Sequence, residues 1–443
     1  MNRRIMMTAV VAATLSVVAA GCGGDDDGGD AAPPDDSNEP EAKDEEEPAE
    51  PVQLRFQSLA WQEQSVAANR DIVDQWNAAN PDIQVEYVQG DWGSVHDQLL
   101  TSFEGGEPPD IIHYDASSIQ VFAEGGYLAD LDPLLSDEFK GGIAEDIWGT
   151  VQYDDFGTIG VPFLVESRLA IANKTQLDEA GIEVPTPDDP WTWDEFADAA
   201  AQLTDDDTYG VAFPLSSPAN AMVTLAQSFG GTYVQDGPAI EVGDAELEVP
   251  RKIHEMLYVD QSAAPQAVAS STTDSLPGFF AGDYAMVFGA IWLRQQMVEQ
   301  APDGFEWVTI PPLEGTDGAA QAANPQILSV AIDSEHPDEA AAFIEFFLNG
   351  ENMAELALGD WLVPTSAEAL AALESSTAGE QGWDVAVASA DALAAAPWRR
   401  TPGFQEWMDR FATPGFQRYF ADEISEDDLA SELEQGGEET LGR

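Results

Sequence analysis

Residues 54–87 read LRFQSLAWQEQSVAANRDIVDQWNAANPDIQVEY, and the fold class follows from this stretch. Residues 54–59 alternate between apolar and polar side chains, which predicts an opening strand. Between Ser65 and Asn80 the apolar residues recur at helical spacing, and Pro81 follows the end of this predicted helix. Residues 83–87 alternate again. The stretch therefore predicts a β-α-β unit.

The same pattern continues towards the carboxyl terminus. Residues 95–103 predict a short helix, residues 109–114 predict a compact apolar strand, and a further helix extends through Phe122. This alternation predicts an α/β fold with a mostly parallel sheet that has helices on both faces. Farther on, Thr192 and Glu195 have the spacing of a helix capping box.

The amino terminus has the three regions of a secretory signal peptide. Arg3 and Arg4 precede an apolar run that is shorter than the ~20 residues of a membrane span. The following Val18-Ala19-Ala20-Gly21-Cys22 resembles the lipobox of bacterial lipoproteins, with Val in place of the commoner Leu. We predict a signal peptide over residues 1–21. The resemblance implies that lipidated Cys22 anchors the chain to the outer face of the cell membrane.

Residues 22–52 are predicted to form a disordered acidic tether. They are mostly Gly, Asp, Glu, Pro, Ala and Ser, so they cannot bury enough apolar surface to fold. Residues 23–52 contain 13 acidic residues and one basic residue. Repulsion between these charges favours an extended chain.

The whole chain has 443 residues and a net charge of −67. Binding to nucleic acid requires Lys and Arg opposite the phosphates, so this composition excludes it. Hydrophobic residues make up 44% of the chain, and its length predicts two lobes. The single Cys excludes an intrachain disulfide. Residues 53–443 hold 70 acidic and 13 basic residues, which predicts a halophile-like acidic surface suited to salty surroundings.

Four stretches of the body share a pattern with a known family. They read FAEGGYLADL at 122–131, GVPFLVESRLAIANK at 160–174, FFAGDYAM at 279–286 and PDEAAAFIEFF at 337–347. In this order and spacing they resemble the family 1 extracellular solute-binding proteins, the maltose-binding-like receptors of ABC importers. One departure is Ala172, where members of the family usually have Tyr.

The resemblance implies a two-lobed, periplasmic-binding-protein-like fold with a hinge that the chain crosses more than once. We place lobe one at residues 53–160 and 328–358, and lobe two at residues 161–327 and 359–443. A ligand in the cleft would favour closure, because only the closed form contacts it from both sides.

A sugar site requires aromatic platforms for the apolar ring faces and polar partners for the hydroxyl groups. Candidate residues are aromatic and polar side chains that follow predicted strands or match cleft loops of the family. One further candidate is a basic side chain near the expected cleft. The candidates are Trp61, Gln62, Asp115, Glu166, Ser167, Trp292, Asn324, Trp361 and Arg399.

The predicted function is capture of a sugar or oligosaccharide and its delivery to the membrane subunits of an ABC permease. We expect a monomer that performs no chemistry and holds no cofactor and no metal, because the four His residues have no metal-binding spacing. Three alternatives stay open. The chain could be a receptor for glycerol phosphate or another small anion, a secreted glycoside hydrolase with paired carboxylates, or a structural surface lipoprotein.

Overall fold

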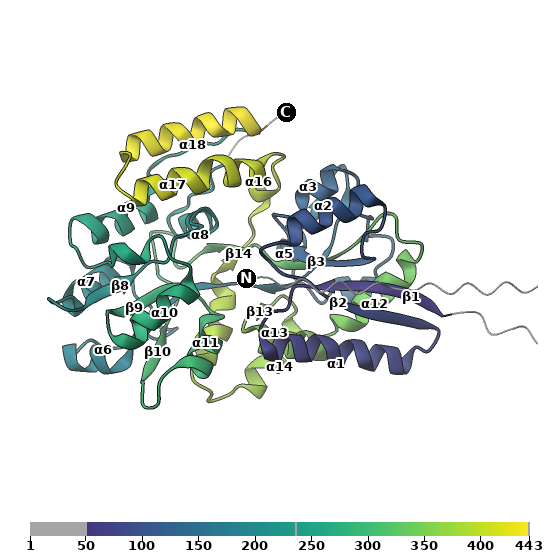
Figure 1. Cartoon of the computed structure of the whole chain (residues 1–443), viewed down its shortest axis with the longest axis horizontal. Coiled ribbons are helices and arrows are strands. Elements are labelled where there is room, and N and C mark those ends of the chain that lie inside the picture. Colours follow the sequence, from purple (N-terminus) through teal and green to yellow (C-terminus); the bar gives the residue numbers. More distant parts are fainter. Residues whose placement is uncertain (1–50, 235–236, 442–443) are drawn as a thin grey trace, which may run out of the picture. The chain divides into compact units, whose positions relative to one another are not determined.

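The computed structural model describes residues 51–234 and 237–441. The predicted signal peptide, Cys22 and the tether up to residue 50 lie outside the described residues. Two sheets, each with its own helices, form the body (Figure 1). This arrangement confirms the predicted two-lobed α/β fold.

The first sheet contains six strands in the order β13-β6-β12-β3-β1-β2. Their bounds are β1 (Val52–Ser58), β2 (Ile83–Gln89), β3 (Ile111–Asp115), β6 (Val161–Val165), β12 (Gln326–Val330) and β13 (Val363–Pro364). β1 is parallel to β2 and β3, whereas β12 is antiparallel to β3 and β6. The prediction of a mostly parallel sheet is therefore wrong beyond β3. The reason is that β12 and β13 return from later parts of the chain in the opposite direction to their neighbours.

Helices cover both faces of this sheet (Figure 1). They are α1 (Glu63–Ala79), α2 (Val95–Gly105), α3 (Gln120–Glu124), α12 (Pro337–Phe347), α13 (Gly350–Asp360), α14 (Ala367–Ser376) and α15 (Trp383–Ala388). Alternation along β1 buries Phe56, whose ring contacts Phe343 and Phe347 of α12 at centroid distances of 5.6 and 5.0 Å. The same core contains Trp76 of α1.

The second sheet contains four strands in the order β10-β7-β9-β8. Their bounds are β7 (Arg168–Asn173), β8 (Tyr209–Ala212), β9 (Tyr284–Ala290) and β10 (Trp307–Ile310). The helices of this lobe are α6 (Lys174–Ala180), α7 (Trp193–Leu203), α8 (Ala219–Leu225), α9 (Asp244–Tyr258), α10 (Thr272–Ala281), α11 (Leu293–Gln300), α16 (Phe404–Trp407), α17 (Thr413–Phe420) and α18 (Glu426–Thr440). The predicted capping box of Thr192 and Glu195 starts α7, and Trp193 is buried in the core.

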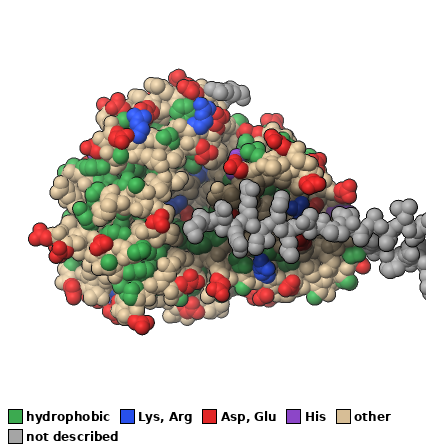
Figure 2. Space-filling view, viewed as in Figure 1, with side chains coloured by type: hydrophobic (Ala, Val, Ile, Leu, Met, Phe, Trp, Pro, Cys, Tyr) green, Lys and Arg blue, Asp and Glu red, His purple; other side chains and the backbone are tan. Residues whose placement is uncertain are grey.

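Shorter elements complete the body. They are α4 (Asp137–Lys140), α5 (Glu145–Trp148), β4 (Gln152–Tyr153), β5 (Gly157–Thr158), β11 (Gln321–Ala322) and β14 (Leu393–Ala394). Figure 2 shows Asp and Glu side chains spread over the visible face, with few Lys and Arg side chains among them. No helix within the described residues combines the length and the apolar character that crossing a membrane requires.

The chain passes between the two sheets three times. The first passage joins β6 to β7 through residues 166–167, the second leads from β10 to β12, and the third leads from α15 to α16. β11 of the second passage pairs in parallel with β14 of the third. The Gln321 side chain of β11 accepts a hydrogen bond from the Arg168 backbone N–H and donates one to the Arg168 carbonyl, both at 2.7 Å. These contacts tie the three passages together.

The lobe boundaries differ from those expected from the sequence. We placed the end of the first segment of lobe one at residue 160, but β6 pairs with β12, so the first sheet continues to Val165. β12 itself begins at Gln326 rather than at residue 328. β13, which we assigned to lobe two, pairs with β6 at the edge of the first sheet. Backbone pairing therefore assigns β6 and β13 to lobe one.

Candidate functional site

Strand direction brings several polar and aromatic side chains to one edge of the first sheet. β1, β2 and β3 are parallel, so the segments after their carboxyl ends meet there. Trp61 follows β1, Asp91 follows β2 and Asp115 ends β3. β12 runs in the opposite direction, so Asn324, which precedes it, reaches the same edge.

The second sheet presents its corresponding edge to the same place. β6 ends at Val165, and the next residue, Glu166, leads directly into β7. β9 is antiparallel to β7, so Trp292, which follows β9, lies near the start of β7. β8 is parallel to β9 and precedes α8, which carries Asn220. The ends of strands from both lobes therefore converge.

A cavity of about 630 Å³ lies where these edges meet. Five of the nine sequence-predicted residues line it, namely Trp61, Asp115, Glu166, Trp292 and Asn324. Its wall also includes residues of the carboxyl-terminal helices, among them Gln405 and Asp409. Both lobes thus contribute to one binding space.

Two tryptophans form an aromatic corner in this cavity. The rings of Trp61 and Trp292 meet edge to face, with centroids 5.8 Å apart and planes at 81°. Trp61 is 49% exposed, so much of its surface is open to a ligand. The Trp292 Nε1–H donates to Glu166 Oε2 at 2.7 Å, and Glu166 Oε1 pairs with Arg168 at 2.6 Å. These contacts fix the orientation of the Trp292 ring.

A second group of contacts orients Asp115. Its Oδ1 atom accepts hydrogen bonds from the backbone N–H groups of Ser117 and Ser118 and from Asn324 Nδ2, at 3.0–3.1 Å. Asn324 Oδ1 in turn accepts from the Ser117 hydroxyl at 2.8 Å. Among the described residues, no hydrogen bond reaches Asp115 Oδ2. This oxygen can accept a hydrogen bond from a ligand hydroxyl.

Asp360 is the most buried acidic residue of the cavity wall, with 5% of its surface exposed. Burial raises the pKa of this carboxyl group to about 7. The nearby Ser65 side chain lowers this pKa, but by less than burial raises it. The carboxyl group is therefore only partly ionised near neutral pH.

The remaining four sequence-predicted residues do not line the cavity. Gln62 is buried and donates from Nε2 to the Asp360 carbonyl at 2.9 Å. Ser167 is buried in the first passage, where its carbonyl accepts from the Ile291 N–H at 3.0 Å. Both residues support neighbours of the cavity.

Trp361 and Arg399 are also buried behind the wall. Trp361 adopts a left-handed backbone conformation (φ 58°), and its ring stacks on Trp383 at 4.3 Å with the Arg294 guanidinium over it at 3.6 Å. Arg399 donates to Asn220 Oδ1 at 3.1 Å and to the Thr224 hydroxyl at 2.7 Å. Burial lowers the pKa of Arg399 to about 10. We had expected these side chains to contact the ligand, but packing inside the lobes occupies them.

Several lining residues were not predicted from the sequence. Asp91 and Trp92 follow the carboxyl end of β2, so the rule that selected Trp61 and Asp115 would have found them. Gln405 and Asp409 carried no such signal, because they reach the cavity from the helical region that follows the third passage.

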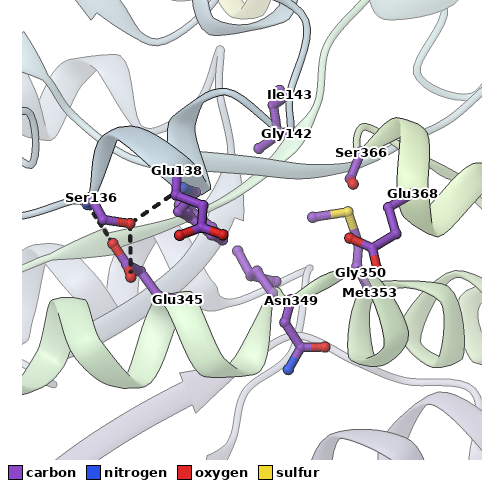
Figure 3. A pocket seen from close by; sticks show the side chains of 12 residues that line it. Ser136, Glu138, Gly142, Ile143, Glu345, Asn349, Gly350, Met353, Ser366 and Glu368 are labelled. Carbon is purple, nitrogen blue, oxygen red and sulfur yellow. Dashed lines mark hydrogen bonds between the residues drawn. The ribbon is translucent and has the colours of Figure 1, made fainter.

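A smaller hollow of about 280 Å³ lies within the first lobe, between α4, α12, α13 and α14 (Figure 3). Glu345 faces it and accepts hydrogen bonds from the backbone N–H and the hydroxyl of Ser136, which caps α4. No residue of the second sheet lines this hollow, and it has no tryptophan. It lacks the features of a cleft that two lobes share. The described residues also contain no group of His, Cys, Asp and Glu that could hold a metal ion.

The chain connects the two sheets three times, and a cavity lies between their converging edges. This arrangement defines a two-lobed binding protein. Residues 60–354 match the model of the family described as bacterial extracellular solute-binding proteins. The "uncharacterized lipoprotein in oleD 5'region" of Streptomyces antibioticus is 46% identical over 378 residues, which cover 84% of this chain and 83% of that protein. The chain belongs to the family of bacterial extracellular solute-binding proteins.

More distant proteins are similar in sequence or in fold. The maltotriose-binding protein of Pyrococcus abyssi is 22% identical over 309 residues, which cover 68% of this chain and 64% of that protein. The GacH receptor of Streptomyces glaucescens, solved unliganded and with acarbose, has a TM-score of 0.74 at 20% identity, covering 88% of this chain and 98% of its own. The cyclic alpha-maltosyl-1,6-maltose binding protein of Arthrobacter globiformis has a TM-score of 0.73 at 20% identity, with coverage of 87% and 98%.

Proposed function

We propose that this chain is the extracytoplasmic receptor of an ABC importer, and that it captures a sugar or oligosaccharide in the cavity between its lobes. The observation that carries the proposal is the corner of Trp61 and Trp292, which brings an aromatic ring from each lobe to the same space. Aromatic rings pack against the apolar faces of sugars. Asp115 and Asn324 supply polar groups for hydroxyls.

Relatives support the same class of ligand. The names of the maltotriose-binding protein, the acarbose-bound receptor and the cyclic maltosyl-maltose binding protein all specify saccharides. The lobes would close on the sugar, because only the closed form contacts it from both sides. The closed receptor would then deliver the sugar to the permease, acting as a monomer and leaving the sugar uncleaved.

The anion-receptor alternative has less support. No Lys or Arg is among the lining residues of the cavity within 51–234 and 237–441, whereas five acidic residues are. Arg399 and Arg168 lie beside the cavity, but Arg399 is hydrogen bonded to Asn220 and Thr224, and Arg168 is paired with Glu166. A phosphate ester would therefore meet repulsion from the cavity wall.

Calorimetric titration with saccharides of one to four residues tests the proposal. We expect one of them to bind, to raise the melting temperature and to reduce the radius of gyration in solution scattering. Glycerol phosphate is the counter-probe. Binding of glycerol phosphate with no saccharide binding would replace the proposed function with the anion receptor.

Replacing Trp292 with alanine should weaken binding of that saccharide at least tenfold, because half of the aromatic corner is lost. A control is Trp191→Ala, which removes a partly exposed tryptophan that does not line the cavity. Circular dichroism should show that both variants remain folded. Unchanged affinity of a folded Trp292→Ala protein would remove Trp292 from the site.

We also propose that Cys22 is lipidated and holds the receptor at the outer face of the cell membrane. The relative from Streptomyces antibioticus is a lipoprotein by its name, which supports this assignment. Mass spectrometry of the membrane-extracted protein should find a lipid-modified Cys22, and a Cys22→Ser chain should be released from the membrane. Unmodified Cys22 in the wild-type protein would contradict the proposal.

A further inference from the structure

The cavity wall carries more negative charge than a neutral ligand requires. Five carboxyl groups line it, from Asp91, Asp115, Glu166, Asp360 and Asp409, and no Lys or Arg of the described residues is among the lining. Acidic residues are abundant throughout this chain, so their number alone decides nothing. The arrangement of the basic groups behind the wall is more informative.

Two of the five carboxyl groups have an arginine as a neighbour. Glu166 pairs with Arg168 at 2.6 Å, and the buried Arg399 acts electrostatically on Asp115. The other three do not take part in any ion pair among the described residues. The cavity therefore separates into a part at Glu166 and Asp115 that arginines compensate and a part at Asp91, Asp360 and Asp409 that no arginine within the described residues pairs with, where His96 acts electrostatically on Asp409.

Asp91 and Asp409 are exposed to water, but exposure does not account for Asp360, which is 5% exposed. A carboxyl group is seldom buried to this extent without a partner, because its charged form loses hydration. Asp409 lies on the exposed side of the cavity wall, and its one side-chain hydrogen bond comes from the neutral Gln405 Nε2 at 3.1 Å. A cationic group in the cavity would supply the missing partner of Asp360 and a second charge contact at Asp409.

The aromatic side chains set a further condition on the ligand. Trp61, Trp92 and Trp292 line the cavity beside these carboxyl groups. Their rings pack against the apolar faces of a sugar, and they also attract ammonium groups. A small polyamine would fill the acidic part but would leave flat ring faces without a matching surface.

We propose that the ligand is a basic saccharide, in which an ammonium group faces Asp360 and Asp409 while the sugar rings pack on the tryptophans. This inference rests on the proposed function and narrows its ligand class. The recognition is electrostatic and involves no covalent step.

The test compares two trisaccharides that differ only in the group at C2 of each ring. The β-1,4-linked trimer of glucosamine carries an ammonium group where cellotriose carries a hydroxyl group at C2. Calorimetry at pH 7 and low salt should give at least tenfold tighter binding for the glucosamine trimer. Raising NaCl to 1 M should weaken binding of the glucosamine trimer about tenfold and should leave any binding of cellotriose nearly unchanged.

Isosteric variants locate the effect within the cavity. Asp360→Asn and Asp409→Asn should each lower the affinity for the glucosamine trimer three- to tenfold, with little effect on cellotriose. Asp338→Asn is the matched control, because it removes one negative charge from α12, outside the cavity. An equal loss in the control would show that the general field of the acidic surface attracts the amine, and it would overturn the inference.

The outcomes separate this inference from the proposed function. Binding of cellotriose or maltotriose as tight as that of the glucosamine trimer would overturn the basic-ligand inference and leave the sugar receptor standing. Binding of spermidine without any saccharide would overturn both. If none of these probes binds, the basic-saccharide inference also fails, and the wider saccharide titration then decides the proposed function alone.

Discussion

Glu166 has two roles that neither its type nor its neighbours in the sequence reveal. It is one of the two residues of the first passage between the sheets, and its carboxylate accepts a hydrogen bond from Trp292 while it pairs with Arg168. A movement of the first passage would therefore also move the Trp292 ring. This residue connects the hinge to the cavity directly.

Asp360 gives a prediction about stability and pH. Its pKa is about 7 in the folded state, whereas an ordinary aspartate has a pKa of 3.8. Between pH 4 and 7 the folded state keeps a proton that the unfolded state releases, so this residue makes the free energy of unfolding fall as pH rises. Relative to Asp360→Asn, the free energy of unfolding of the wild-type protein should fall by up to about 4 kcal/mol across this window, at about 1.4 kcal/mol per pH unit.

Urea unfolding of both proteins at pH 4.5, 6 and 8 would measure this difference. Asp338→Asn is again the control, since Asp338 lies in the exposed first turn of α12. If the free energies of unfolding of wild type and Asp360→Asn differ by the same amount at all three values of pH, Asp360 is ionised throughout.

Individual site residues were predictable where strand order alone places them. Trp61 follows a predicted strand and Asp115 stands at the end of another, and the cavity lies at the carboxyl edge of these parallel strands. Trp292 is indicated by the family resemblance instead. Trp361 also comes at the end of an element, but its left-handed backbone turns the ring away into the core. No pattern of residue types distinguishes these two outcomes, because the direction of a side chain depends on the packing around it.

At the scale of elements, the packing of α13 against α1 sets the position of Asp360, which is the last residue of α13. Gly359 lies so close to α1 that a Cβ atom there would come within 2.8 Å of Ser65 Cα. Backbone cannot move aside as a flexible side chain can. Gly359→Ala should therefore destabilise the protein by roughly 2 kcal/mol or more.

Gly105 offers an opposite control for this prediction. It lies in α2, and an added Cβ atom there would meet nothing within 4 Å. Gly105→Ala should leave the stability unchanged or raise it by roughly 0.5–1 kcal/mol, because alanine favours the helix. Denaturant unfolding of both variants checks the difference in sign. Equal effects would mean that α13 can shift away from α1.

The passages between the lobes give a second prediction at this scale. Gln321 makes two hydrogen bonds to the Arg168 backbone, and leucine of similar size would leave both Arg168 groups without these partners. Gln321→Leu should lower the free energy of unfolding by about 1–3 kcal/mol. Gln202→Leu, on the exposed surface of α7, is the control. Equal stability of the two variants would show that Gln321 does not hold the passages together.

Most helices and strands could be predicted from periodicity, but the boundaries between lobes could not. Residues 161–165 are apolar throughout, so their composition fits a buried strand in either lobe. Their partner β12 lies far along the chain, and pairing with it assigns them to the first sheet. The assignment depends on a long-range contact, and local patterns carry no information about such contacts.

For the whole molecule, the acidic composition predicts a dependence on salt. The body has 70 acidic and 13 basic residues, so like charges repel in the folded state. Raising NaCl from 0.05 to 2 M should screen this repulsion and raise the melting temperature by roughly 3–6 °C. Scanning calorimetry would measure this shift, with sucrose of equal osmolality as an uncharged control. A melting temperature that stays flat in NaCl, or rises equally in sucrose, would contradict the prediction.

The interleaved lobes also have a consequence for the order in which a nascent chain can fold. β1, β2 and β3 are synthesised first, but β3 lacks its second neighbour until residues 326–330 of β12 have left the ribosome. All four strands of the second sheet lie between residues 168 and 310, so that lobe can complete its sheet earlier. An unpaired strand edge is a template for association with other chains. The half of the molecule that is made first is therefore finished last, and until then β3 is its point of greatest exposure to aggregation.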